Sequence, residues 1–184
     1  MKTMTSIKQM TLAAVCAALC VVLPIAFHSV PNAGSVFLPM HIPVLICGLI
    51  CGWPYGLVCG LMGPLLSSII TGMPPAAILP SMMVECGIYG LTASLVLKFL
   101  RTGNTYADLY IALVAAMLAG RVISGIAKAL IFSPGLAMSA WVGSSFVTAL
   151  PGILIQLVFL PSVVFALMKA GIVPVRYAKG EAAA

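Results

Sequence analysis

Apolar residues along the chain fall into six long runs, and short stretches rich in Pro, Gly and polar residues separate these runs. A helix needs about 20 mostly apolar residues to cross a hydrocarbon core roughly 30 Å thick. With the breaks as boundaries, the pattern predicts an all-α integral membrane protein, a six-transmembrane-helix bundle that forms a single domain over residues 1–184. The predicted spans are residues 9–29, 37–52, 54–71, 79–100, 107–131 and 140–169.

The basic residues indicate how the bundle crosses the membrane, because positively charged connections stay on the cytoplasmic side. With six spans, most Lys and Arg residues fall on one side: Lys2, Lys8, Lys98, Arg101, Lys169, Arg176 and Lys179. The three connections on the opposite side, residues 28–36, 72–79 and 132–139, contain no Lys or Arg. We therefore predict a multi-pass protein of the cytoplasmic cell membrane with both termini in the cytoplasm.

Composition excludes a soluble fold and leaves little room for a nucleic-acid partner. Asp, Glu, Lys and Arg make up 7% of the residues and apolar residues 62%, whereas a soluble domain carries roughly 25% and 45–50%. The net charge of +6 comes from dispersed residues without the interleaved aromatic side chains that a nucleic-acid footprint needs. The expected surroundings are a lipid bilayer, and no nucleic acid is expected as a partner.

Cysteine is frequent, but its spacing does not indicate a metal centre. No Cys-x-x-Cys is present, and the pairs with four-residue spacing have no nearby His or carboxylate to complete a tetrahedral site. In apolar helices cysteine behaves as a small packing residue. We therefore predict no disulfide framework, no metal and no cofactor for Cys16, Cys20, Cys47, Cys51, Cys59 and Cys86.

Ionisable residues inside the predicted spans are the first candidates for a binding site, since each costs roughly 2.5–3.5 kcal/mol at the bilayer centre. Arg121, Ser124 and Lys128 share one face of the fifth span. Glu85 lies early in the fourth span, with Tyr89 one turn away. Glu85 could pair with one of the cations simply to neutralise buried charge. A second cation would still remain, which favours a pocket for an anionic or carboxylate-bearing small molecule.

Further polar candidates lie near the same predicted outer side. They are Asn32 and Trp141 in the connections and His41 between two prolines at the start of the second span. In the predicted substrate site, Arg121 and Lys128 bind the anionic end of the ligand and Glu85 orients Lys128 or a donor on the ligand. Hydrogen bonds and apolar walls would come from Tyr89, Asn32, His41 and Trp141.

Catalytic motifs are missing from the chain, so we predict that the protein is not an enzyme. The sequence has no Gly-x-x-x-x-Gly-Lys-Ser/Thr loop with which to hydrolyse ATP, and neither a Gly-x-Ser-x-Gly elbow nor a His-Glu-x-x-His pair. Two rivals remain open. A self-contained ion-coupled secondary transporter of a small anionic metabolite would use Glu85 as its proton-binding group. An intramembrane enzyme would need His41 and Ser67 or Ser68 as base and nucleophile.

Small residues at four-residue spacing mark two faces where helices can approach closely in lipid. One comprises Gly48, Gly52, Gly56 and Gly60, which would let the second and third spans pack tightly against each other. The other is in the first span and comprises Ala13, Ala14, Ala17 and Ala18. Internal packing explains both stripes; the first span could alternatively slide against another membrane subunit.

Several segments together resemble the substrate-binding S components of energy-coupling factor (ECF) transporters, and the similarity extends over nearly the whole chain. These segments are residues 37–44 (FLPMHIPV), 63–68 (GPLLSS), 71–74 (TGMP), 85–90 (ECGIYG) and 119–121 (AGR). The resemblance implies a complex with a transmembrane coupling subunit and two cytoplasmic ATPases, which power a toppling motion that delivers the ligand inward.

The resemblance also implies roles for particular residues. Ala13, Ala14, Ala17 and Ala18 would dock on the coupling subunit, and the outer connections, with Asn32, Met73 and Pro74, would cap the ligand. Such subunits take up water-soluble vitamins or related micronutrients with energy from ATP hydrolysed by their partners. The motifs leave pantothenate, pyridoxine-type compounds, cobalamin and folate open, while the cationic face of the fifth span favours a carboxylate or phosphate, such as pantothenate.

Overall fold

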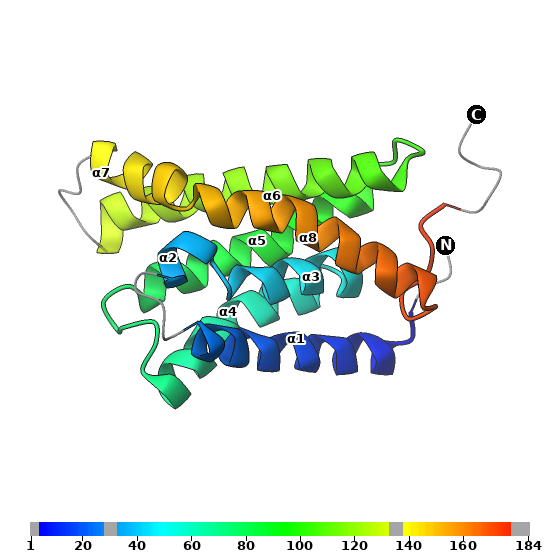
Figure 1. Cartoon of the computed structure of the whole chain (residues 1–184), viewed down its shortest axis with the longest axis horizontal. Helices are drawn as coiled ribbons and strands as arrows, with labels where there is room; N and C mark the ends of the chain where they lie inside the picture. The colour runs from blue at the N-terminus through cyan, green and yellow to red at the C-terminus, as the bar shows by residue number, and fades with distance from the viewer. Residues whose placement is uncertain (1–3, 28–32, 133–137, 178–184) are drawn as a thin grey trace.

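The computed structural model describes residues 4–27, 33–132 and 138–177, and all its regular secondary structure in these ranges is helical. In chain order the helices are α1 (Ser6–Ala26), α2 (Ala33–Phe37), α3 (His41–Cys51), α4 (Trp53–Thr71), α5 (Leu79–Phe99), α6 (Thr105–Ala127), the π-helix η1 (Lys128–Phe132), α7 (Met138–Val142), the π-helix η2 (Gly143–Thr148) and α8 (Leu150–Lys169) (Figure 1).

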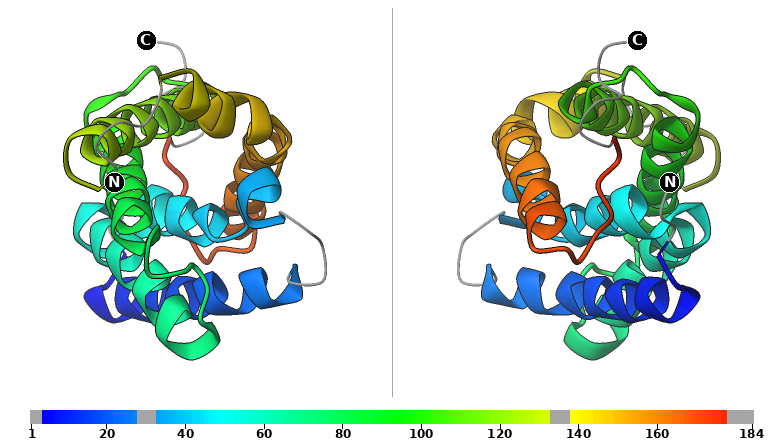
Figure 2. Two further views of the ribbon diagram at one scale, coloured as in Figure 1. Left: turned by 90° about the vertical axis from the view of Figure 1, so that its left-hand side faces the viewer. Right: turned by 90° about the vertical axis from the view of Figure 1, so that its right-hand side faces the viewer.

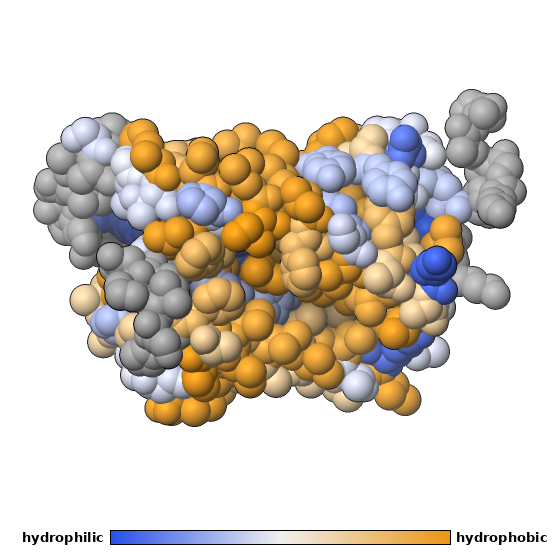
Figure 3. Space-filling view, in the orientation of Figure 1, coloured by the Kyte–Doolittle hydropathy of each residue, from blue (hydrophilic) through white to orange (hydrophobic). Residues whose placement is uncertain are grey.

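Six of the described segments are long and apolar enough to cross a membrane, which confirms the predicted all-α bundle of six spans. They are Ser6–Ala26, Gly34–Cys51, Trp53–Thr71, Leu79–Phe99, Thr105–Ile131 and Leu150–Lys169. Viewed along the bundle, the helices form a ring (Figure 2). Apolar residues cover the middle of the face in Figure 3, and hydrophilic residues lie toward its two ends.

The structure divides residues 140–169, predicted as the last span, between helices of different types. The π-helix η2 occupies residues 143–148, and a separate helix, α8, begins at Leu150. Pro151 in the first turn of α8 explains the new start, because proline lacks the N–H that a continuing helix would use. The second predicted span is also interrupted: Leu38, with φ 53°, separates α2 from α3.

Both ends of the described chain lie at the same end of the bundle, where α1 begins and α8 ends (Figure 1). We call this the terminal end. The opposite end carries α2, α7 and the connection between α4 and α5, and we call it the pocket end. An even number of crossings requires this arrangement, as predicted; it does not by itself say which end faces the cytoplasm.

Glycines in the middle of the bundle bring three helices together rather than two. Gly48 of α3 and Gly56 of α4 both face Gly90 of α5: a Cβ placed on Gly90 would lie 2.2 Å from the Gly56 carbonyl oxygen. A Cβ on Gly60 would lie 2.3 Å from the carbonyl oxygen of Cys86. The predicted glycine stripe therefore allows close packing, but its main partner is α5.

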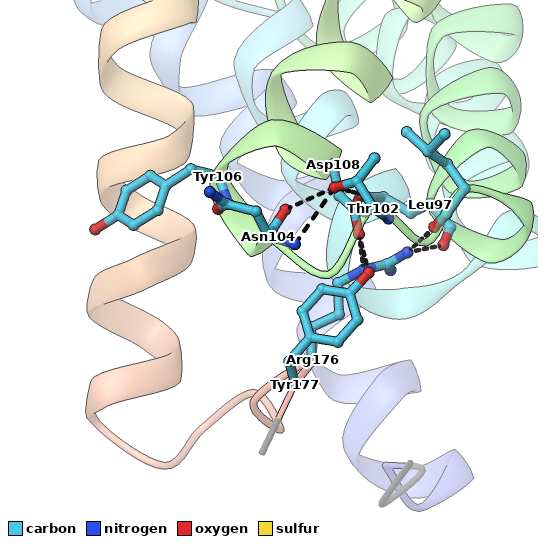
Figure 4. A network of polar contacts seen from close by, with 8 residues as sticks. Leu97, Thr102, Asn104, Tyr106, Asp108, Arg176 and Tyr177 are labelled. Atoms are coloured by element: carbon cyan, nitrogen blue, oxygen red, sulfur yellow. Dashed lines mark hydrogen bonds and ion pairs between the residues drawn. The ribbon is translucent and has the colours of Figure 1, made fainter. Parts of the chain in front are cut away.

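At the terminal end, Asp108 of α6 gathers hydrogen bonds from the segment that follows α8 (Figure 4). The Asp108 side chain is fully buried. Its Oδ2 accepts from Arg176 Nε and from the Tyr177 hydroxyl, both at 2.5 Å, and its Oδ1 accepts from the backbone N–H and the hydroxyl of Thr102. The segment after α8 is thus tied to α6 across this end of the ring.

Arg176 also completes the C-terminus of α5. Its Nη2 donates to the carbonyl oxygens of Leu97 and Leu100, and the last carbonyls of a helix have no partner within the helix. One guanidinium therefore joins three elements: the end of α5, the start of α6 and the segment after α8.

We expect Arg176→Ala to destabilise the bundle by about 3 kcal/mol, because the change leaves the buried Asp108 carboxylate without its cation. Thermal unfolding of the purified protein in detergent measures the loss. Lys169→Ala, which removes an exposed basic residue from the last turn of α8, is the matched control and should leave the midpoint nearly unchanged. Equal midpoints for the two variants would contradict the role of Arg176.

Candidate functional site

A cavity of about 660 Å³ opens among the helices at the pocket end. Residues of α1, α2, α3, α4, α5, α6, η1 and η2 line it. Small-molecule sites in proteins span roughly 300–1,000 Å³ and are mostly apolar with a few convergent polar groups. The volume of this cavity is therefore that of a site for a small organic molecule.

Glu85 lies where the polar side chains of the cavity converge. Its Oε1 is 3.6 Å from His41 Nε2 and 3.9 Å from Arg121 Nε, and its Oε2 is 3.9 Å from Lys128 Nζ. The hydroxyls of Tyr89 and Ser124 each donate to Glu85 at 3.3 Å. One carboxylate from α5 thus meets side chains from α3, α6 and η1.

The three contacts between Glu85 and the basic side chains are loose. Charge-assisted N–H···O bonds are typically about 2.7–2.9 Å long, and these N···O distances are 3.6 to 3.9 Å. Glu85 therefore partly neutralises Arg121 and Lys128 without a tight bond to either. The arrangement leaves room for a ligand to bond to the cations.

Helical spacing explains why α6 supplies so many of these groups. Arg121 and Ser124 are buried in α6, and Lys128, seven residues beyond Arg121, opens η1 with its side chain 28% exposed. The Arg121 guanidinium also lies 5.6 Å from the ring centre of Phe146 in η2. Single-turn π-helices are frequent at functional sites, and here two of them carry cavity residues.

The other predicted site residues lie at different depths. His41 lines the cavity. Tyr89 is fully buried behind it, with ring centres 5.1 Å apart, and reaches the site through Glu85. Trp141 packs against Gly125 of α6, where an added Cβ would lie 2.4 Å from the indole. Asn32 lies outside the described residues.

Some residues that line the cavity were not predicted from the sequence. Met82 and Ser81 precede Glu85 on α5, and Met82, three positions earlier, could have been found from helical spacing alone. Ser144 and Ser145 lie in η2, and no pattern in the sequence signals that their π-helix turns toward the cavity.

The alanine stripe of α1 divides between two environments. Ala13 and Ala17 are half-buried and pack against the hydrophobic core. Ala14 and Ala18 are exposed on the outside of the bundle. Cys16 and Cys20, buried on the inner side of α1, contribute to the same core. Internal packing therefore accounts for half of the stripe, and the other half is a smooth outer surface.

Six helical spans around a ligand-sized cavity with a cluster of charged side chains define a multi-pass membrane protein with a candidate site for a small molecule. The family described as "ECF transporter, substrate-specific component" matches residues 8–175, and the chain belongs to this family. This match confirms the predicted resemblance. The family is a transporter component that binds substrate rather than an enzyme. A comparison with curated proteins gives no match.

Proposed function

We propose that the protein captures a water-soluble vitamin or related micronutrient at the outer face of the cytoplasmic membrane. The observation that carries this proposal is the 660 Å³ cavity at the pocket end, with Glu85, Arg121, Lys128 and His41 in its wall. Charged groups inside a membrane bundle are costly and typically face a cavity that uses them. Binding is the whole role of this subunit, and ATP hydrolysed by partner subunits powers uptake.

The pocket end faces outward in this proposal, and both termini are cytoplasmic. Lys8 and Lys169, near the start of α1 and the end of α8, and Lys98 and Arg101, at the end of α5, support this orientation. They gather at the terminal end, where the positive-inside rule expects them.

Each side chain of the site has a proposed task. Arg121 and Lys128 bind the anionic end of the ligand. Glu85 lies near both cations and orients Lys128. Tyr89 holds the Glu85 carboxylate in position through its 3.3 Å hydrogen bond. His41 bonds to the ligand directly.

Two predicted site residues remain, Trp141 and Asn32. Trp141 supports the outer part of α6 by packing on Gly125. Asn32 is proposed as a capping residue on the strength of its sequence position alone.

The proposed partners are an ECF transmembrane coupling subunit and two ATPase subunits. Ala14 and Ala18 support this part of the proposal, because exposed small side chains let a helix of another membrane protein approach the α1 backbone closely. Ala13 and Ala17, on the adjacent inner face, pack α1 against the core. This packing keeps Ala14 and Ala18 on the outer surface of the bundle.

Mass spectrometry of the protein purified in mild detergent tests the proposed capture. We expect one small organic compound to co-purify at close to one molecule per chain, since a capture subunit must retain its ligand against dilution. Uptake of this compound by cells should require the ATPase subunits and should survive an uncoupler. Uptake that needs the proton gradient and not the ATPases would instead support an ion-coupled secondary transporter with Glu85 as its proton-binding group.

A further inference from the structure

The charges around the cavity do not balance. Among the described residues that line it, Arg121 and Lys128 are cationic and Glu85 is the one carboxylate, which leaves one excess positive charge with His41 neutral. The segments 28–32 and 133–137 contain no Asp, Glu, Lys or Arg in their sequence. An unbalanced charge within a membrane bundle is unfavourable. With His41 neutral, a ligand with a single negative charge restores neutrality, whereas a cation adds to the excess.

His41 marks a second polar position in the same cavity. Its side chain is only 2% exposed, and within the described part of the chain neither ring nitrogen has a hydrogen-bond partner. Its Nε2 lies 3.6 Å from the Glu85 carboxylate, which is too long for a hydrogen bond. A buried polar group without a partner costs roughly 1–3 kcal/mol. A hydroxyl or amide of the ligand can supply the missing bond, because a neutral imidazole both donates and accepts.

The apolar part of the wall suits a flexible, saturated body. Methionine and proline dominate it, with Met40, Met73 and Met82 from three different segments. Thioether side chains adapt to irregular aliphatic shapes. Planar ring systems gain from stacking on aromatic side chains, and among the described lining residues Phe27 is the one benzene-type ring, with no Trp or Tyr.

We propose that the ligand is a small organic monoanion with a non-planar aliphatic body, whose carboxylate binds between Lys128 and Arg121 and whose hydroxyl or amide group bonds to His41. This inference rests on the proposed function, since it names the ligand class of the same cavity. It predicts that the site distinguishes ligands by charge at one end and by hydrogen bonding at the other.

Binding of a probe panel to the purified full chain tests the class. Pantothenate and biotin are monoanions with non-planar, largely aliphatic bodies. Panthenol is the neutral counterpart of pantothenate. Nicotinate is a planar monoanion, and thiamine is an aromatic cation. We expect pantothenate or biotin to bind tightest, at least about 100-fold tighter than panthenol, nicotinate and thiamine. If nicotinate, thiamine or panthenol binds tightest, the proposed ligand class is wrong and the proposed function stands. If nothing binds and nothing co-purifies, both fail.

Lys128→Gln tests the charge argument separately. The Lys128 side chain is partly exposed, so its replacement should leave the fold intact, which thermal unfolding checks. We expect the preference of the site for a carboxylate ligand over its neutral amide or alcohol to fall from about 100-fold to less than about tenfold. His41→Ala is the matched variant. It should lower the affinity for the carboxylate ligand and for its neutral counterpart by the same factor, and so preserve the preference. An unchanged preference in Lys128→Gln would overturn the proposal.

Discussion

Arg121→Ala should weaken ligand capture at least about 30-fold. The Arg121 side chain is 3% exposed and lies 3.9 Å from the Glu85 carboxylate, so its removal takes away an anion-binding group and leaves Glu85 with fewer positive neighbours. Truncating one partner of a buried charge pair costs about 2–5 kcal/mol, which corresponds to an affinity loss of at least about 30-fold. Equilibrium binding of the co-purified compound, measured by calorimetry, gives the loss directly.

Two controls separate this effect from damage to the fold. Lys98→Ala removes an exposed basic residue at the terminal end of α5 and should bind as the wild type does. Thermal unfolding of Arg121→Ala should remain cooperative, because Phe146 and Glu85 can still pack around the shortened side chain. Wild-type affinity in a folded Arg121→Ala protein would remove the main support for the proposed site.

Replacing both Ala14 and Ala18 by Leu should strongly reduce uptake while leaving capture intact. Both alanines are exposed on α1, so larger side chains do not disturb the core, but they hold a partner helix away from the α1 backbone. Overpacking costs typically 1–3 kcal/mol at a close contact, and we expect uptake by cells to fall at least about tenfold. Ligand affinity of the purified variant should match the wild type.

The matched control for this prediction is Ala166→Leu, which enlarges an exposed alanine on α8. It adds the same side chain to a different face of the bundle and should take up the compound normally. Normal uptake by the Ala14 and Ala18 variant would mean that this face of α1 does not dock on a partner subunit. Equal losses in both variants would point to insertion or expression instead.

The six spans could be predicted because length and apolar content are properties of each segment by itself. The broken span over residues 140–169 could not. The choice between an α-helix and the π-helix η2 depends on how Ser144 and Phe146 pack against the cavity and Arg121, which is a tertiary effect. Likewise, the glycine stripe predicted a close helix approach, but the partner of Gly56 could be identified only once the position of Gly90 in space was known.

Part of the candidate site could be predicted from the sequence for a similar reason. Arg121, Ser124 and Lys128 share a helix face, so their proximity follows from the helical repeat. Glu85 stood out as a carboxylate well inside a predicted span. The contact between His41 of α3 and Glu85 of α5 could not be deduced. It depends on the angle at which α3 leaves the turn at Leu38. How deeply the side chains of Tyr89 and Trp141 are buried also depends on tertiary packing and could not be predicted.

An experimental structure of the protein purified with its retained ligand, in a lipid nanodisc, tests the central claim most directly. The account predicts density for one small molecule in the cavity at the pocket end, with an oxygen of its anionic group within hydrogen-bond distance of Lys128 and Arg121. A ligand bound elsewhere, or a closed cavity with both cations turned outward to lipid headgroups, would contradict it.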